Sequence, residues 1–183
     1  MLKFALLGFL AYRPMTGYDL KQTLQRSTAN FWHAELSQIY ITLKKLHTEG
    51  LVSSVAVEQD SRPDRRVYTI TEEGISDLRR WLRTPDTEIH PSKEPFLLKL
   101  FFSAPVEKEF LLTQLRIQRD LHQSLVDAYR SQTAAIIATA VARAPHLQRD
   151  ALLWEATRRA GEVIDEAIVS WLDETIERVR QDF

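Results

Sequence analysis

The first segment of the chain carries apolar residues at the spacing of an α-helix. These residues recur at intervals of three and four, and they are Leu2, Ala5, Leu6, Phe9 and Leu10. The pair Arg13-Pro14 ends the pattern, because the residue before a proline disfavours helical geometry. Thr16 then has the chemistry of an N-cap, and a second helix is predicted from there to about Arg26.

A third helix is predicted between Leu36 and Glu49, with Gly50 as its C-terminal cap. Its apolar stripe contains Leu36, Ile39, Leu43 and Leu46. Side chains three and four residues apart share one face of a helix, so the remaining residues must lie on the opposite face and its flanks. The opposite face contains Ser37, Ile41, Lys44 and Thr48, with Tyr40 and Lys45 on its flanks, and Gln38 is a further candidate contact.

A β-hairpin and a fourth helix follow. Alternating valines in 51–58 and β-branched residues in 66–70 predict two strands, and 59–65 has the composition of a loop with a basic tip. Thr71 is the expected cap of the next helix, which has acidic residues in its first turn. Three helices, a hairpin and a helix form the plan of a winged helix-turn-helix, whose third helix enters the major groove of DNA.

Prolines divide the chain near its middle. Four of the seven lie within 21 residues, at Pro85, Pro91, Pro95 and Pro105. We therefore expect two domains: a winged helix-turn-helix over 1–90, and a helical, coiled-coil-like dimerisation domain over 91–183. The predicted fold class is mainly α, with the hairpin as the β component.

The second domain is predicted to contain one short and two long helices. They span 93–103, 106 to beyond 130, and 148–180, with a break at Pro145. Their apolar stripes are too extensive for a small head to bury, so a second chain is expected to cover part of them. The predicted dimer contacts are Leu111, Leu115, Leu125, Tyr129, Ile164, Ile168 and Trp171. Two heads related by two-fold symmetry would suit a palindromic operator.

Composition excludes several classes of protein. The chain has no cysteine, which rules out disulfide scaffolds, thiol nucleophiles and Cys-based zinc sites. The apolar run 4–12 is interpreted as a buried helix rather than a signal peptide, and no segment approaches the ~20 apolar residues that a membrane span needs. We expect a cytoplasmic protein without a membrane partner.

Charge and motif content also limit the classes of function that the sequence supports. The net charge is −1, with 12 basic and 11 acidic residues in 1–90, so bulk charge does not support nucleic-acid binding. The five histidines form no pair at helical ligand spacing, and a metal site is not expected. The sequence lacks phosphate loops, nucleophile elbows and helical zinc-protease motifs, so we expect no enzyme and no cofactor.

Particular residues nevertheless have the placement that DNA binding needs. On the third helix of a winged head, Tyr40, Lys44 and Lys45 would face the groove; on an arbitrary helix they would be a solvated surface. Arg62, Arg65 and Arg66 at the hairpin could bind phosphates or pair internally with Asp60 and Asp64. Thr16 and Tyr18 could bond a phosphate at the start of the second helix, and Tyr18 could equally pack on the first helix.

Several segments together resemble the PadR family of transcriptional regulators. They are Leu6-Leu7-Gly8-Phe9-Leu10, Met15-Thr16-Gly17-Tyr18-Asp19-Leu20, Gln38-Ile39-Tyr40, Glu49-Gly50-Leu51-Val52 and Arg62-Pro63-Asp64-Arg65-Arg66-Val67-Tyr68. Residues 96–102 are similar to the start of the virulence-activator-like domain of long members. Family members often have proline where this chain has Ile41. The resemblance implies a dimeric repressor that a small aromatic or phenolic compound sometimes releases from DNA.

Two questions stay open at this level. Phe96, Phe101, Phe102 and Trp171 could line a pocket for such a compound between the two domains, or they could be ordinary core residues. The leading function is a sequence-specific, ligand-responsive repressor. The alternative is a winged-helix protein-interaction module, or a constitutive architectural DNA binder without an effector.

Overall fold

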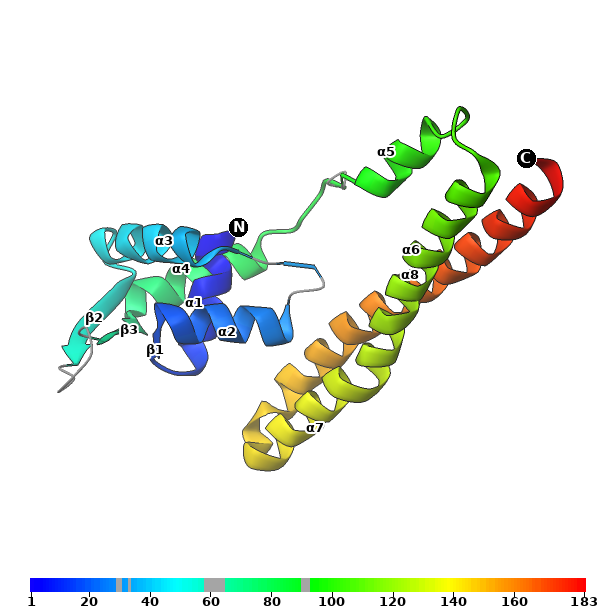
Figure 1. The fold of residues 1–183 in the computed structure, drawn as a ribbon. Coiled ribbons are helices and arrows are strands. Elements are labelled where there is room, and N and C mark those ends of the chain that lie inside the picture. Colours follow the sequence, from blue (N-terminus) through cyan, green and yellow to red (C-terminus); the bar gives the residue numbers. More distant parts are fainter. Residues whose placement is uncertain (29–30, 33, 58–64, 90–92) are drawn as a thin grey trace. The chain divides into compact units, whose positions relative to one another are not determined.

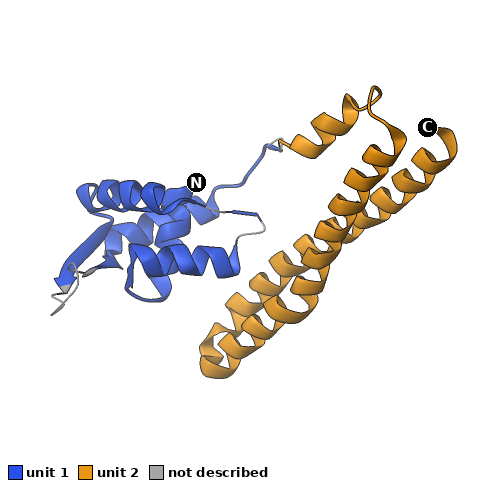
Figure 2. Cartoon of the chain, in the orientation of Figure 1, with its two compact units in different colours: residues 1–89 blue, residues 90–183 orange. Residues whose placement is uncertain are grey.

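The computed structural model of the chain describes residues 1–28, 31–32, 34–57, 65–89 and 93–183. The chain forms two compact units, residues 1–89 and 90–183 (Figure 2). The first is a winged helix-turn-helix with a small antiparallel sheet, and the second consists of long helices, which confirms the predicted fold class. Among the described residues, no helix combines the length and apolarity that crossing a membrane requires.

The helices of the first unit begin and end close to the predicted residues. They are α1 (Leu2–Tyr12), α2 (Gly17–Ser27), α3 (Leu36–Thr48) and α4 (Glu72–Arg83) (Figure 1). Their apolar stripes meet in one core, where Leu6, Leu20, Ile39 and Leu43 are completely buried. Burying such side chains supplies most of the drive to fold, at about 1.5–3 kcal/mol each. The core fixes which face of α3 is left exposed.

The sheet contains three strands, one more than predicted. The strands β1 (Met15–Thr16), β2 (Val52–Val57) and β3 (Arg65–Ile70) are antiparallel in the order β1-β3-β2. Met15 lies opposite Tyr68. A two-residue strand is too short to show alternation, so periodicity could not reveal β1.

The junction between α3, the sheet and α4 depends on a tight approach of backbones. Gly50 ends α3 with a φ of +72°, the left-handed conformation that glycine accepts readily. The Thr71 hydroxyl donates to the Gly50 carbonyl at 2.8 Å and accepts the Gly74 N–H at 3.1 Å. A Cβ on Gly74 would lie 2.2 Å from the Leu51 carbonyl oxygen, so this turn of α4 needs glycine.

The second unit is an antiparallel pair of long helices with shorter segments at its ends (Figure 1). Its elements are α5 (Pro95–Phe101), α6 (Lys108–Ala128), a π-helical turn (Tyr129–Thr133), α7 (Ala134–Arg143), a 3-10 turn (Pro145–Leu147) and α8 (Gln148–Asp182). The predicted break at Pro145 is confirmed. The predicted second helix is interrupted by the π-helical turn, which takes an extra residue and for which periodicity gave no signal.

Three of the predicted dimer contacts lie inside the protomer instead. Leu111 and Leu115 pack with Leu172 and Ile176 in the core between α6 and α8, and Leu115 is completely buried. Tyr129 is 6% exposed. These residues are not available to a second chain, because α8 folds back along α6 and covers them.

The inner face of α8 is not the apolar stripe that periodicity predicts. Ile164 is 59% exposed and Trp171 37%, whereas Glu162 and Asp165 are buried. Each buried carboxylate has a partner across the pair of helices. His122 Nδ1 lies 2.5 Å from Asp165 Oδ1. Charged groups tolerate burial when they are paired and hydrogen-bonded, which allows them to replace apolar residues here.

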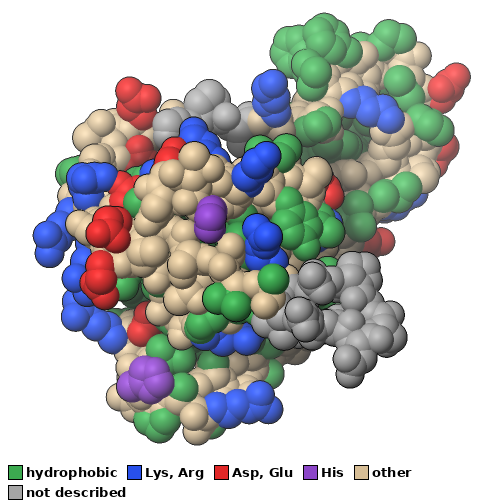
Figure 3. All heavy atoms as spheres, turned by 90° about the vertical axis from the view of Figure 1, so that its left-hand side faces the viewer, with side chains coloured by type: hydrophobic (Ala, Val, Ile, Leu, Met, Phe, Trp, Pro, Cys, Tyr) green, Lys and Arg blue, Asp and Glu red, His purple; other side chains and the backbone are tan. Residues whose placement is uncertain are grey.

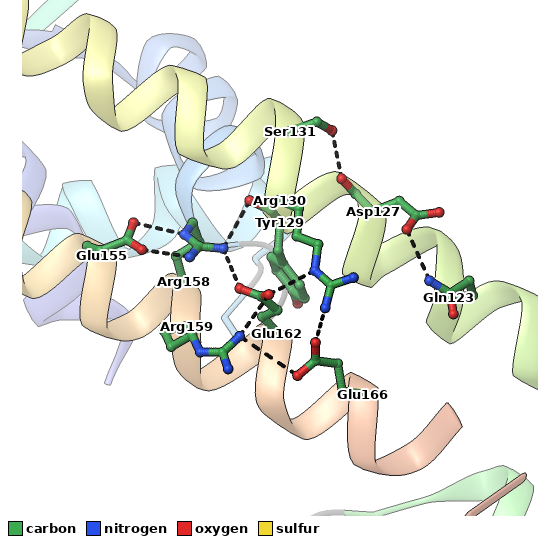
Figure 4. Close-up of polar contacts among 10 residues, drawn as sticks. All are labelled: Gln123, Asp127, Tyr129, Arg130, Ser131, Glu155, Arg158, Arg159, Glu162 and Glu166. Atoms are coloured by element: carbon green, nitrogen blue, oxygen red, sulfur yellow. Dashed lines mark hydrogen bonds and ion pairs between the residues drawn. The ribbon is translucent and has the colours of Figure 1, made fainter. Parts of the chain in front are cut away.

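Glu162 is the centre of an ionic cluster beside the π-helical turn (Figure 4). Its carboxylate accepts from Arg130 Nε at 2.9 Å, from Arg158 Nη1 at 2.7 Å and from Arg159 Nη1 at 2.7 Å. Arg158 also donates to the Tyr129 carbonyl at 3.2 Å. The cluster thereby joins the π-helical turn to α8.

Candidate nucleic-acid interface

The exposed face of α3 has the composition predicted for it. Ile39, Leu43 and Leu46 are at most 1% exposed, while Ser37, Ile41 and Lys44 lie in solvent on the opposite side. Ile41 is 70% exposed, although it is a branched apolar residue. A hydroxyl, an apolar side chain and an ammonium group are therefore presented together, which are groups that can contact base edges and phosphates in a major groove.

Two of the predicted contacts at the ends of this face have partners within the protein. The Gln38 side-chain oxygen accepts the Glu35 N–H at 3.1 Å and so takes part in capping α3. Lys45 Nζ lies 3.8 Å from Glu49 Oε1, a loose pair with the lysine side chain 75% exposed. Exposed pairs of this kind contribute little stability, so Lys45 can exchange Glu49 for another anion at low cost.

Thr16 requires a correction. Its side chain is buried, and its hydroxyl donates to Asp19 Oδ2 at 2.7 Å while accepting the Asp19 N–H at 3.1 Å. The Thr16 N–H donates to the same carboxylate at 3.0 Å, which completes a capping box. The hydroxyl hydrogen is thus committed to Asp19, and Thr16 positions the start of α2 rather than offering a hydroxyl to phosphate.

Two tyrosines flank the start of α2. Tyr18 is 57% exposed, which favours the interpretation of it as a surface contact over packing on α1. Tyr40 is 45% exposed, and its ring lies against the backbone of Gly17. Periodicity placed Tyr40 on the flank of α3, but it carried no signal for this contact between two helices.

A third tyrosine lies below the surface near Tyr40. Tyr68 of β3 is buried, and burial raises the pKa of its hydroxyl. Arg66 works against this increase in pKa, and Tyr40 adds to it. Tyr68 thus stays neutral at physiological pH and belongs to the support beneath the face, not to the face itself.

Three arginines are predicted to contact DNA from the hairpin. Arg66 is exposed on β3. Arg65 begins the same strand, with its side chain outside the described part, and Arg62 lies outside the described residues. As contacts to DNA, all three stay predictions.

Basic side chains of the described residues are interspersed with other types on the face that Figure 3 shows. Figure 3 shows Lys and Arg side chains distributed among acidic, hydrophobic and uncharged ones, in agreement with the near-neutral charge of this half of the chain. Within the described ranges, no group of three His, Asp or Glu side chains has the geometry of a metal site. Recognition would therefore depend on a few placed groups, not on bulk attraction.

The residues predicted to form an effector pocket differ in exposure. Phe96 packs against the core between α6 and α8. Phe101 and Phe102 are 81% and 68% exposed, and their rings meet edge to face at 5.0 Å. Trp171 is partly exposed on α8. A pocket formed by these four side chains stays a prediction.

Family models match both units of the chain. The model of the transcriptional regulator PadR-like family matches residues 6–80, and that of the C-terminal domain of virulence activator alpha matches residues 92–180. The chain is 26% identical to the negative transcriptional regulator PadR of Bacillus subtilis, over 100% of this chain and 99% of that one. A probable transcriptional regulator of Mycobacterium tuberculosis is 29% identical, over 98% of each chain.

Solved structures match the same two units. Bacillus subtilis PadR in complex with operator DNA has a TM-score of 0.81, with 24% identity over 97% of both chains. The same protein has also been solved with p-coumaric acid. The Vibrio cholerae virulence activator AphA has a TM-score of 0.71, with 30% identity over 98% of both chains.

Proposed function

Because the chain belongs to the PadR-like family of transcriptional regulators, which bind DNA and are not enzymes, we propose that it is a homodimeric repressor released from its operator by a small aromatic acid. The observation that carries the proposal is the exposed face of α3, where Ser37, Ile41 and Lys44 lie opposite the buried side chains of Ile39, Leu43 and Leu46. Such a repressor would act on chromosomal DNA in the cytoplasm.

The proposed DNA contacts come from three elements. Ile41 and Ser37 meet base edges in the major groove, and Lys44 and Lys45 meet phosphates or guanine edges. Tyr18 and Tyr40 contact the sugar-phosphate backbone of the DNA where it passes the start of α2. The wing contributes Arg62, Arg65 and Arg66, which bind the DNA phosphates beside the groove. A guanidinium group suits this role because it keeps its charge and offers two parallel hydrogen-bond donors.

The proposed dimer uses the apolar side chains that the protomer leaves in solvent. On α6 these are Ile117, Leu121 and Leu125, and on α8 they are Ile164 and Trp171, all between 37% and 59% exposed. Ile168, the third predicted contact on α8, packs partly on the core between the two helices. Exposed apolar side chains on two paired helices are typical of an interface between copies of one chain, and two-fold symmetry would place two heads on a palindrome.

Release by an aromatic acid is supported by a relative and by exposed aromatic side chains. The structure of Bacillus subtilis PadR with p-coumaric acid supplies the ligand class. Phe101 and Phe102 are rings on which a planar ligand could stack, with Phe96 and Trp171 as further candidates. The named relative is a negative regulator, which supports repression over activation.

The test starts from DNA selected by the purified protein out of a random duplex library. Replacing Lys44 with Ala should weaken binding and reduce the salt slope of log Kd by about 1, as expected for one lost phosphate contact. Lys93→Ala, an exposed lysine outside the first unit, is the matched control and should leave both unchanged. Failure to select any sequence would contradict the proposal.

A panel of aromatic acids tests the effector. A compound that raises the melting temperature and releases the selected operator supports a ligand-responsive repressor. Binding that no compound in the panel alters would favour a constitutive DNA binder.

A further inference from the structure

We propose that Gly17 is a positioning residue for operator recognition: its bare backbone seats the Tyr40 ring and so sets the placement of α3 against the start of α2. The inference rests on the proposed DNA-binding function and adds to it a residue with no side chain to offer DNA. It concerns how the exposed face of α3 is held, not which of its groups touch the duplex.

The geometry of the contact leaves no room for a side chain. A Cβ on Gly17 would lie 2.6 Å from Tyr40 Cε1, 2.9 Å from Cζ and 3.1 Å from Cδ1. Real contacts of this kind lie at about 3.5–4.0 Å, where dispersion attraction is greatest. The edge of the ring therefore occupies the place where any other residue would put its first carbon.

Backbone conformation does not explain the glycine. Among the described residues, Gly50 has a positive φ and Gly17 does not. Alanine could adopt the backbone of Gly17 without strain, and it is a better helix former than glycine. The Tyr40 ring is thus the feature of the structure that demands glycine here.

Neither side of the contact can move without changing the candidate interface. The start of α2 is held by the capping box of Thr16 and Asp19, and Thr16 pairs with Val67 in the sheet. On the other side, Tyr40 follows Ile39, which is completely buried. A side chain at position 17 must therefore either swing the Tyr40 ring outward or displace α3, and both moves alter the surface around Ile41 and Lys44.

Recognition is sensitive to displacements of this size. Binding groups must be held within about 0.5 Å of their productive positions by the residues behind them. Lys21 Nζ lies 3.2 Å from Glu35 Oε2, which adds a second, exposed link between α2 and the start of α3. Because that pair is solvent-exposed and weak, the Gly17–Tyr40 contact is the stronger determinant of the spacing.

The experiment is a double-mutant cycle of Gly17→Ala and Tyr40→Ala, read by operator affinity and by thermal unfolding. Gly17→Ala should weaken operator binding about tenfold, which is the coupling typical of residues in contact. In the Tyr40→Ala background the same change should have no further effect, because the ring that clashes is gone. Tyr40→Phe keeps the ring and should preserve the sensitivity to alanine at position 17.

Gly8→Ala is the matched control, because a Cβ at that helical glycine meets nothing within 4 Å. It should bind the operator like the wild type. Two results would overturn the inference. One is wild-type operator affinity in Gly17→Ala. The other is an equal loss of affinity from Gly17→Ala in the wild-type and in the Tyr40→Ala background. If Gly17→Ala does not fold, the double variant must recover folding, and its failure to do so would also overturn it.

If the proposed DNA-binding function is wrong, the experiment gives a different result from the one that overturns the role of Gly17. If the wild type binds no DNA, the affinity arm is lost but the unfolding arm of the cycle still measures the coupling between Gly17 and Tyr40. If the unfolding data show coupling between Gly17 and Tyr40 but the protein binds no DNA, the contact is supported and its role in DNA recognition is rejected.

Discussion

Lys3 of α1 and Asp77 of α4 form an ion pair at the edge of the first core, with Nζ 2.8 Å from Oδ2. Asp77 is buried, and Lys3 also reaches Glu49 at 3.4 Å beyond the end of α3. One ammonium group thus links three helices. Beside it, the rings of Phe4 and Trp81 stack at 4.7 Å, so α1 and α4 are joined by both charge and apolar contact.

Replacing Lys3 with Met should destabilise the protein by about 1–3 kcal/mol at neutral pH, because the buried carboxylate of Asp77 would lose the ammonium group and keep the largely exposed Arg80 as its partner. The measurement is chemical denaturation followed by tryptophan fluorescence. Lys21→Met is the control: it removes a pair whose acidic partner, Glu35, is 73% exposed, and it should cost about 1 kcal/mol or less. Equal losses in the two variants would contradict the importance assigned to Lys3.

The same pair predicts a pH dependence. The hydrogen bond from Lys3 lowers the pKa of Asp77 below its ordinary value, and burial only partly opposes this. The resulting stabilisation is complete above the unfolded-state pKa of about 3.9 and is lost as the pH falls through the lower folded-state value. Lys3→Met should therefore lose less stability than the wild type between neutral and acid pH, as measured by unfolding at a series of pH values.

Gly74→Ala should be strongly destabilising, by about 1–3 kcal/mol or more, because the added carbon meets the Leu51 carbonyl at 2.2 Å and Ile70 Cγ1 at 2.8 Å. A backbone carbonyl in the sheet junction cannot move aside as a flexible side chain can. Gly8→Ala, which adds its carbon into open space, should be neutral or stabilising. Melting temperatures of the two variants test the contrast.

Glu162 predicts the acid response of the second unit. Hydrogen bonds from Arg130 and then Arg158 lower the pKa of Glu162 from 4.5 to about 2. The cluster should therefore stabilise the helices fully above about pH 4.5 and lose this contribution as the pH falls toward 2. Glu162→Gln should remove most of that dependence in circular dichroism, whereas Glu177→Gln, at an exposed pair on the same helix, should leave it intact.

Ile41 should contribute to base recognition through thymine methyl groups, given its exposure at the centre of the α3 face. Replacing a critical thymine of the operator with uracil removes one methyl group and should weaken wild-type binding about fourfold, the value of one buried carbon group. In Ile41→Ala the same base change should matter much less. If Ile41→Ala loses as much affinity as the wild type when thymine is replaced with uracil, Ile41 does not contact that methyl group in the groove.

Ile164→Glu should produce a monomer that keeps its fold, because Ile164 is 59% exposed in the protomer and a carboxylate there would be buried only in the dimer. Arg116→Glu, on an exposed polar side of α6, is the control and should stay dimeric. Analytical ultracentrifugation at micromolar concentration distinguishes the two. A dimeric Ile164→Glu protein would place the interface elsewhere.

Local pattern was enough to predict most of the first unit. The stripe through Ile39, Leu43 and Leu46 requires only that helical side chains recur every 3.6 residues, and the structure buries all three. Caps at Thr16, Gly50 and Thr71 follow equally local chemistry. The Tyr40 contact with Gly17 could not be found this way, because it depends on how two separate helices pack against each other and not on the pattern within either one.

The second unit shows where such patterns become ambiguous. Helix α8 has two faces that could pack inward, one with Ile164 and Trp171 and one with Glu162, Asp165 and Leu172. Apolarity alone favours the first. The protomer uses the second, because Arg130 of the π-helical turn pairs with Glu162 and His122 of α6 lies within hydrogen-bond distance of Asp165. That compensation involves partners 32 to 43 residues away, beyond the reach of periodicity.

In the second unit, the contact between α6 and α8 is partly ionic, and apolar side chains are exposed on the outside. Dimerisation through those side chains would make the stability of the fold depend on protein concentration. If the outer stripe of Ile164 and Trp171 is covered by a second copy, dilution exposes that surface and weakens each tail at the same time. The melting temperature would then rise with protein concentration. Cellular abundance would set how much protein is assembled and able to occupy both halves of a site.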